Sequence, residues 1–179
     1  MGMAPLPPEL IRELDLRRVR AIADYQFGPG AGRALFPDEV EIIRSKRTGR
    51  IKHVYLRGSL LATVRAEDGL LSLTIAGAER LSPFLGERYK VVVSEEAAPF
   101  VAEGRSAFAK HVLRADPGIR PGDEALVVAP DGRLLAVGRA VLSGREMVIF
   151  KRGVAVKIRA GIRERRGPRT PDAFKPGAS

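Results

Sequence analysis

Apolar and polar positions follow two rhythms in the first half of the chain. From Pro8 to about Ala23, apolar residues recur at helical spacing and predict one helix or two short ones, with Asp15 capping the second. Closely spaced glycines around Pro29 predict a loop over residues 26–35. Short β-rich runs separated by glycine-bearing turns then predict an antiparallel meander. Its strands are expected at 41–45, 51–56, 60–65 and 70–75.

The second half has shorter apolar runs and one helical stretch. A strand is expected over 89–93, followed by a helix over 95–103 that Ser94 begins and Gly104 ends. Pro-Gly, Asp-Gly and Ser-Gly pairs separate the remaining β-rich runs, as in a compact barrel. These strands are expected at 107–115, 124–129, 134–142 and 154–159. The expected fold class is therefore α+β, with an N-terminal helix packed on an antiparallel meander, followed by a mixed β-barrel with one main helix.

The order of these patterns predicts two domains and a tail. Pro83 and Gly86 indicate a linker, so we expect an α+β domain over 1–84 and the barrel over 85–162. Charges and prolines with little to bury predict a basic flexible tail over 163–179. No apolar run is long enough to cross a membrane, and the N-terminus does not look like a secretory signal. We therefore expect a soluble, cytoplasmic protein.

The charge of the chain changes this picture most. A formal net charge of +10 and a pI near 10.6 indicate a polyanionic partner, above all a nucleic acid. Arginine outnumbers lysine, and its planar guanidinium can pair with two phosphate oxygens at once. Asparagine is absent and Gln26 is the only glutamine, which fits a protein working at high temperature. A G+C-rich genome would bias the composition in the same direction.

Residues suited to catalysis or metal binding are scattered. The absence of cysteine excludes disulfides, thiolate metal sites and a cysteine nucleophile. His53 and His111 lie in different predicted domains without companions for a zinc site. The glycines of 28–32 lack the lysine and the strand-to-helix setting of a phosphate loop. We expect no catalytic site, metal, cofactor or small-molecule substrate; an unrecognised enzyme site in the first domain is the alternative.

Several motifs in both halves resemble a known family. The second half contains IRPGDEALVV, LLAVGRAVLSGREM and KRGVAVKIRAGI, and over 89–162 it resembles a PUA domain. The first half contains DYQFGPGAG, RALF and EIIRSKRTGRIKHVY. It resembles the domain that precedes PUA at the C-terminus of archaeal archaeosine tRNA-guanine transglycosylases. The resemblance implies a PUA-type barrel that binds RNA.

The resemblance does not extend to the catalytic part of that family. The TIM-barrel domain that exchanges the base, with its zinc-binding cysteines, has no counterpart in this sequence. The resemblance therefore implies a non-catalytic protein that binds the acceptor region of tRNA and assists a separately encoded transglycosylase subunit. PUA domains also occur in ribosome-associated factors, so the alternative is a translation factor that binds rRNA or initiator tRNA.

The resemblance also implies where RNA lies. In PUA domains it contacts the loop between the first helix and second strand, and the final strands, which here are 104–110 and 151–157. Gly104 allows close approach to a phosphate, and Arg105 and Ser106 supply donors. Phe108 is expected either to stack on an unpaired base or to belong to the core. The expected RNA-binding residues are Gly104, Arg105, Ser106, Phe108, Lys110, Arg139, Lys151, Arg152, Gly153 and Lys157.

Cations also concentrate on one predicted hairpin of the first domain. Strand alternation places Arg44 and Lys46 on one face, and the turn projects Arg47 and Arg50. A common surface there could neutralise several phosphates, although an ordinary solvated turn is the alternative. This second candidate RNA surface comprises Arg44, Lys46, Arg47, Arg50 and Lys52.

Overall fold

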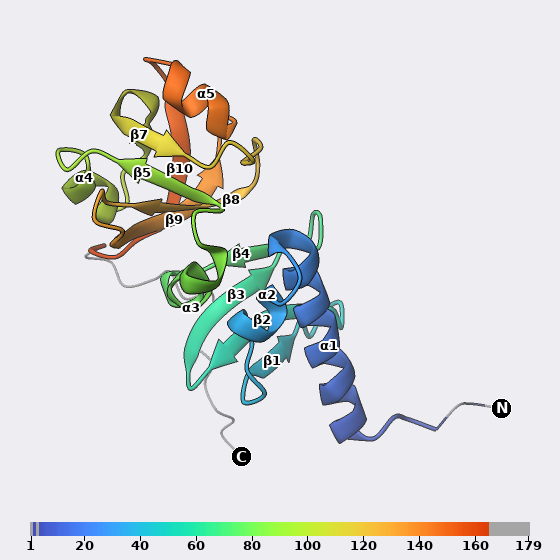
Figure 1. Ribbon diagram of the computed structural model, residues 1–179. Coiled ribbons are helices and arrows are strands. Elements are labelled where there is room, and N and C mark those ends of the chain that lie inside the picture. Colours follow the sequence, from blue (N-terminus) through green and yellow to red (C-terminus); the bar gives the residue numbers. More distant parts are fainter. Residues whose placement is uncertain (1, 3, 165–179) are drawn as a thin grey trace.

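The first domain is a four-stranded antiparallel sheet with helices against it (Figure 1). The structure, a computed structural model, describes residues 2 and 4–164. Most of the expected tail, 165–179, lies outside the described residues. The strands lie in the order β1-β2-β3-β4. The elements are α1 (Pro8–Phe27), α2 (Ala31–Leu35), β1 (Glu41–Arg44), β2 (Ile51–Leu56), β3 (Ser59–Val64), β4 (Leu71–Leu73) and α3 (Ile75–Leu85).

The predicted strands of the meander are confirmed, but the loop predicted over 26–35 is wrong. Helix α1 continues to Phe27, whose buried side chain extends its apolar face. Helix α2 then starts after Gly30, which adopts a left-handed conformation at φ 94°. Gly32 packs so closely that a Cβ there would overlap the carbonyl oxygen of Arg20. The glycines thus bring two helices into contact.

Two further local predictions are wrong. Asp15 does not cap a helix, because it lies buried inside α1 and forms an ion pair with Arg44 of β1. Pro83 does not lie in a linker, because residues 75–85 form helix α3 around it. Thr74 begins that helix by accepting a hydrogen bond from the Gly77 amide at 3.1 Å. The chain enters the second domain only after Gly86.

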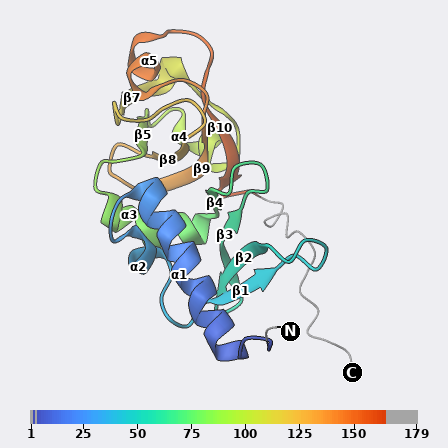
Figure 2. The same cartoon turned by 90° about the vertical axis from the view of Figure 1, so that its right-hand side faces the viewer.

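The second domain is a nearly closed mixed barrel (Figure 2). Its strands lie in the order β6-β10-β9-β8-β5-β7, in which β5 and β8 pair in parallel and the other neighbours are antiparallel. The expected α+β fold class is confirmed. The elements are β5 (Lys90–Val93), α4 (Ala98–Ala102), β6 (Ala107–Phe108), the 3-10 helix η1 (Ala109–His111), β7 (Val112–Ala115), β8 (Glu124–Val128), β9 (Leu134–Ala140), α5 (Gly144–Ile149) and β10 (Val154–Gly161).

The elements of the barrel also differ from the predicted ones in three places. The run 107–115 is not one strand, because η1 divides it into β6 and β7. The expected helix over 95–103 is shorter and its N-cap is Ala97, while Ser94 lies in the preceding turn, where its hydroxyl accepts from the Ala97 amide at 3.4 Å. Helix α5 was not predicted. Its signal is a capping box, in which the side chains of Ser143 and Glu146 each accept a backbone hydrogen bond from the other residue.

The two domains share part of one core. Leu126 and Val137 of the barrel belong to the same buried cluster as Val54 and Leu71 of the first sheet. Charged side chains of the barrel also bond to the first domain, since Arg159 donates to the Leu73 carbonyl at 2.6 Å. The carboxylate of Glu124 accepts hydrogen bonds from the guanidinium of Arg159 and, at 3.0 Å, from the amide of Leu73. These contacts hold the barrel in a fixed position on the first domain.

Candidate nucleic-acid interface

The two stretches expected to contact RNA lie side by side. Strand β6 pairs antiparallel with the start of β10, so that Phe108 lies opposite Val154. The amide of Ala109 also donates to the carbonyl of Gly153 at 2.9 Å. Segments 104–110 and 151–157, distant in sequence, therefore form one continuous surface along the β6–β10 edge. We call this surface the β6–β10 surface.

Gly104 adopts a left-handed conformation, but the space beside it is occupied. Its φ of 95° lies in the left-handed region that favours glycine. A Cβ there would overlap the carboxylate of Glu164, which also accepts a hydrogen bond from the Gly161 amide at 3.1 Å. A carboxylate thus lies where we expected a phosphate, and the two anions would compete for the same space.

Arg105 is exposed and supported by an aromatic ring. Its guanidinium carbon lies 5.4 Å from the centre of the Phe100 ring, and its amide donates to the carbonyl of Phe100. This cation–π contact orients the guanidinium without neutralising it. One face of Arg105 therefore stays available for an anion or a base.

Two aromatic side chains are exposed near the start of β10. Phe108 is 44% exposed, which agrees with the base-stacking alternative rather than the core alternative. Phe150 is 46% exposed and directly precedes Lys151. Sequence analysis missed Phe150, although its place beside Lys151, Arg152 and a glycine was a signal. Lys110, Lys151 and Arg152 are exposed within two residues of these rings along the chain, so the same two segments carry aromatic faces and positive charge.

Arg139 of β9 and Lys157 of β10 lie further along the sheet from the start of β10. They are paired across β9 and β10, which places both side chains on the same face of the sheet. Arg139 forms an ion pair with Glu67 of the first domain at 3.1 Å and also donates to the Gly122 carbonyl. It therefore contributes to the domain interface, whereas Lys157 remains exposed.

The hairpin of the first domain keeps only part of its expected cationic surface. Arg44 donates through two nitrogens to the buried carboxylate of Asp15, and through a third to the Gly49 carbonyl. The hydrogen bond to Asp15 raises the pKa of the Arg44 guanidinium. Arg44 thus fastens β1 to α1. The remaining cations of the set are exposed on or beside the turn: Lys46, Arg47, Arg50 and Lys52.

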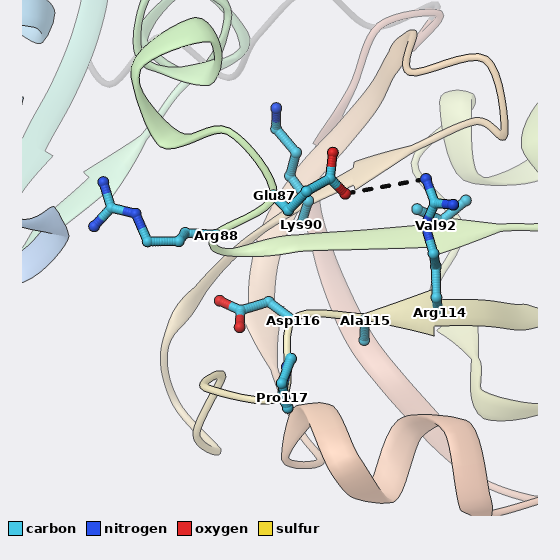
Figure 3. Close-up of a pocket in the computed structure, with 8 residues that line it drawn as sticks. All are labelled: Glu87, Arg88, Lys90, Val92, Arg114, Ala115, Asp116 and Pro117. Atoms are coloured by element: carbon cyan, nitrogen blue, oxygen red, sulfur yellow. Dashed lines mark ion pairs between the residues drawn. The ribbon is translucent and has the colours of Figure 1, made fainter.

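A shallow pocket of about 170 Å³ lies where the chain enters the barrel (Figure 3). Its charged groups already have partners within the chain. Arg114 pairs with Glu87 at 4.0 Å, and Lys90 donates to the carbonyl of Ser82. Asp116 accepts hydrogen bonds from the amides of Tyr89 and Gly118. The pocket therefore offers less to a charged ligand than the β6–β10 surface does.

Tyr89 fixes the junction beside this pocket. Its φ of 62° is unusual for a residue with a side chain. Its hydroxyl donates to the Gln26 carbonyl at 2.6 Å, and its ring packs edge-on against Phe27. Burial raises the pKa of the Tyr89 phenol. The strained backbone is thus held by contacts to both domains.

No metal cluster or membrane helix is found in the described part of the chain. Among residues 2 and 4–164, no three His, Cys, Asp or Glu side chains gather closely enough to hold a metal ion. The helices in the same range are too short or too polar to cross a membrane.

Comparison with known families agrees with this architecture. Residues 17–87 match the family model for the patch-forming domain C2 of tRNA-guanine transglycosylase, and residues 89–162 match the PUA domain. The chain is therefore a PUA domain protein with a C2 domain in front of the barrel. More particularly, it resembles the C-terminal part of archaeal tRNA-guanine(15) transglycosylase.

The relatives define how far this similarity reaches. The enzyme from Pyrococcus abyssi is 56% identical over 84% of this chain but only 26% of its own length. The enzyme from Methanothermobacter thermautotrophicus is 49% identical over 82% of this chain and 23% of its own length. The chain thus spans about a quarter of these relatives, at their C-terminal end.

Solved structures with both domains are also similar. A hypothetical protein from Pyrococcus horikoshii has a TM-score of 0.67 and 26% identity, over 90% of this chain and 95% of that one. A conserved PUA domain protein from Thermoplasma acidophilum has a TM-score of 0.59 and 22% identity, over 86% of this chain and 92% of its own. The second likeness shows the fold alone.

Proposed function

We propose that the chain binds the acceptor region of tRNA along the β6–β10 surface and assists tRNA modification without catalysing it. The observation that carries the proposal is the pairing of β6 with β10, which joins two cationic segments and the exposed ring of Phe108. Cations neutralise phosphates and an aromatic face stacks on an unpaired base, and a tRNA 3′ end offers both targets.

The comparisons support the same role. Both matched domains occur in enzymes named tRNA-guanine(15) transglycosylase, and the match is confined to their C-terminal part. We infer that the chain presents tRNA to a transglycosylase catalytic subunit supplied as a separate chain. Binding through charge requires no cofactor and no reacting group of its own.

The test compares the affinity for full-length tRNA with that for the same tRNA lacking its single-stranded 3′ end, at two salt concentrations. We expect tighter binding to the full-length tRNA and a steep loss of affinity with salt. Equal binding to both RNAs would favour the alternative of rRNA or another helical target. No binding to either would contradict the proposal.

A further inference from the structure

The N-terminal half of α1 extends beyond the sheet (Figures 1 and 2). The buried residues of the whole helix are Asp15, Val19, Ala23 and Phe27, whereas residues 8–13 are all exposed. Pro7, before the helix, provides no side-chain cap. Helical turns without tertiary packing are only marginally stable in water. The first turns of α1, residues 8–13, therefore contribute no buried side chain to the core, although Arg12 donates to the carbonyls of Asp38 and Val40.

The outward face of α1 carries apolar side chains flanked by the exposed Arg17 and Arg18. Leu10, Ala21 and Tyr25 lie within about 60° of one another around the helix, opposite the buried face. Tyr25 is 84% exposed and Leu10 is 39% exposed, with the half-buried Leu14 between them. None of these side chains is needed for the core. An apolar stripe on the outside of a helix is typical of a surface that packs on a partner.

The position of this chain within its longer relatives indicates which protein could contact the outward face of α1. This chain corresponds to their C-terminal quarter, and the match to the C2 domain begins only at residue 17. The exposed first turns of α1 therefore precede the matched domain, on the side of the chain that adjoins the remaining three quarters in the relatives. In the family that the sequence resembles, that part contains the catalytic domain.

Two other occupants of this face, a second copy of the chain and RNA, fit it less well. Arg17 and Arg18 are exposed midway along the stripe, so a symmetric antiparallel pairing of two copies would bring like charges together. Tyr25 and the two arginines could contact RNA, but the apolar side chains of Leu10 and Leu14 between them offer it neither a donor nor an aromatic face. A protein surface with apolar side chains and carboxylates complements the stripe better than a second copy or RNA.

We propose that the outward face of α1 docks the catalytic part of a tRNA-guanine transglycosylase. The face comprises Leu10, Leu14, Arg17, Arg18, Ala21 and Tyr25. This inference rests on the proposed function as an accessory chain. It adds a division of labour, in which α1 holds the enzyme and the β6–β10 surface holds the RNA at the far domain.

The test mixes the full chain with the Pyrococcus abyssi enzyme from which the matching C-terminal quarter has been removed. Only a preparation of that enzyme that unfolds cooperatively is used, and calorimetry measures the association. We expect Leu10→Glu combined with Tyr25→Ser to weaken association by at least about tenfold. The matched control is Ile149→Glu, because Ile149 is 68% exposed on α5 of the other domain. It should leave association unchanged.

The measurements of association and of tRNA binding each have a result that would support or contradict the docking surface. Circular dichroism should show that both variants keep the wild-type helix content, since the substituted side chains are exposed. Absence of association with the folded enzyme, or equal weakening by Ile149→Glu, would overturn the docking surface. The affinity of the α1 double variant for tRNA should equal that of the wild type, and a loss there would show an RNA contact instead. Association without any tRNA binding would uphold docking while refuting the proposed RNA function.

Discussion

The domain interface and the β6–β10 surface use their cations in opposite ways. At the interface, Arg159 and Arg139 bind the carboxylates of Glu124 and Glu67. Along the β6–β10 surface, Arg105 rests on a phenyl ring, and in the described part of the chain no ion pair involves it or Lys151. A cation bound to a carboxylate is already neutralised, whereas a free one can release counterions from RNA. The partners of the cations, more than net charge, are therefore the basis for expecting RNA at the β6–β10 surface.

The largest effect should come from breaking the interface. Arg159→Ala leaves the buried carboxylate of Glu124 without its main partner, and we expect a loss of about 3 kcal/mol in the free energy of unfolding. Denaturant unfolding measures this loss. Arg152→Ala, on the RNA side, should change the free energy of unfolding by less than about 0.5 kcal/mol. Similar losses in both variants would remove the distinction between the two regions.

The next effect should come from the aromatic part of the β6–β10 surface. Phe108→Ala removes an exposed stacking face, and loss of stacking costs about 1–3 kcal/mol per base. We expect roughly tenfold weaker binding to full-length tRNA and little change for tRNA without its 3′ end. Equilibrium titrations of the two RNAs provide the comparison. An equal loss for both would show that Phe108 does not contact the 3′ end.

A smaller gain should follow from removing the competing carboxylate beside Gly104. Glu164→Ala removes a negative charge from the expected phosphate position, and exposed charge pairs contribute about 0.2–1 kcal/mol. We expect tRNA affinity to rise about two- to fivefold at low salt, with the gain shrinking as salt increases. Filter binding at several salt concentrations measures it. Unchanged affinity would show that no phosphate approaches Gly104.

The smallest effect concerns a buried group of the first domain. Burial lowers the pKa of the His53 imidazole, and the charge of Lys52 lowers it further. The unfolded chain therefore binds a proton more readily, and the stability that neutral His53 contributes is lost as pH falls from about 6.5 through its folded pKa. His53→Gln should flatten this acid dependence, measured by unfolding between pH 7 and 5. A parallel pH profile would assign the dependence to other groups.

Most strands were predictable because turn residues that show in the sequence bound them, but β6 and β7 were not separated, since the 3-10 helix between them, Ala109–His111, contains no glycine or proline. Helix α2 was not predictable, because Gly30 and Gly32 are typical loop residues. The close packing of Gly32 against Arg20 shows only in the structure. Helix α3 was hidden by Pro83, which usually ends a helix. Local sequence therefore predicted the sheets better than the helices packed on them.

The site was predictable in part. Segments 104–110 and 151–157 were named from a resemblance, and the pairing of β6 with β10 brings them together. The ion pairs of Arg44 with Asp15 and of Arg139 with Glu67 were not predictable, because each joins residues far apart in the chain. The alternation of side chains along a strand predicts the face of the sheet on which a cation lies, but it does not predict the carboxylate with which that cation pairs.

The most direct test of the account is the salt dependence of tRNA binding by two variants. Removal of a phosphate contact lowers the slope of log K against log salt by about 0.7–0.9. The account predicts that Arg105→Ala combined with Lys151→Ala flattens the slope by about two such contacts, while Arg139→Ala leaves it at the wild-type value. A flattened slope for Arg139→Ala and an unchanged one for the double variant would place the RNA elsewhere on the protein.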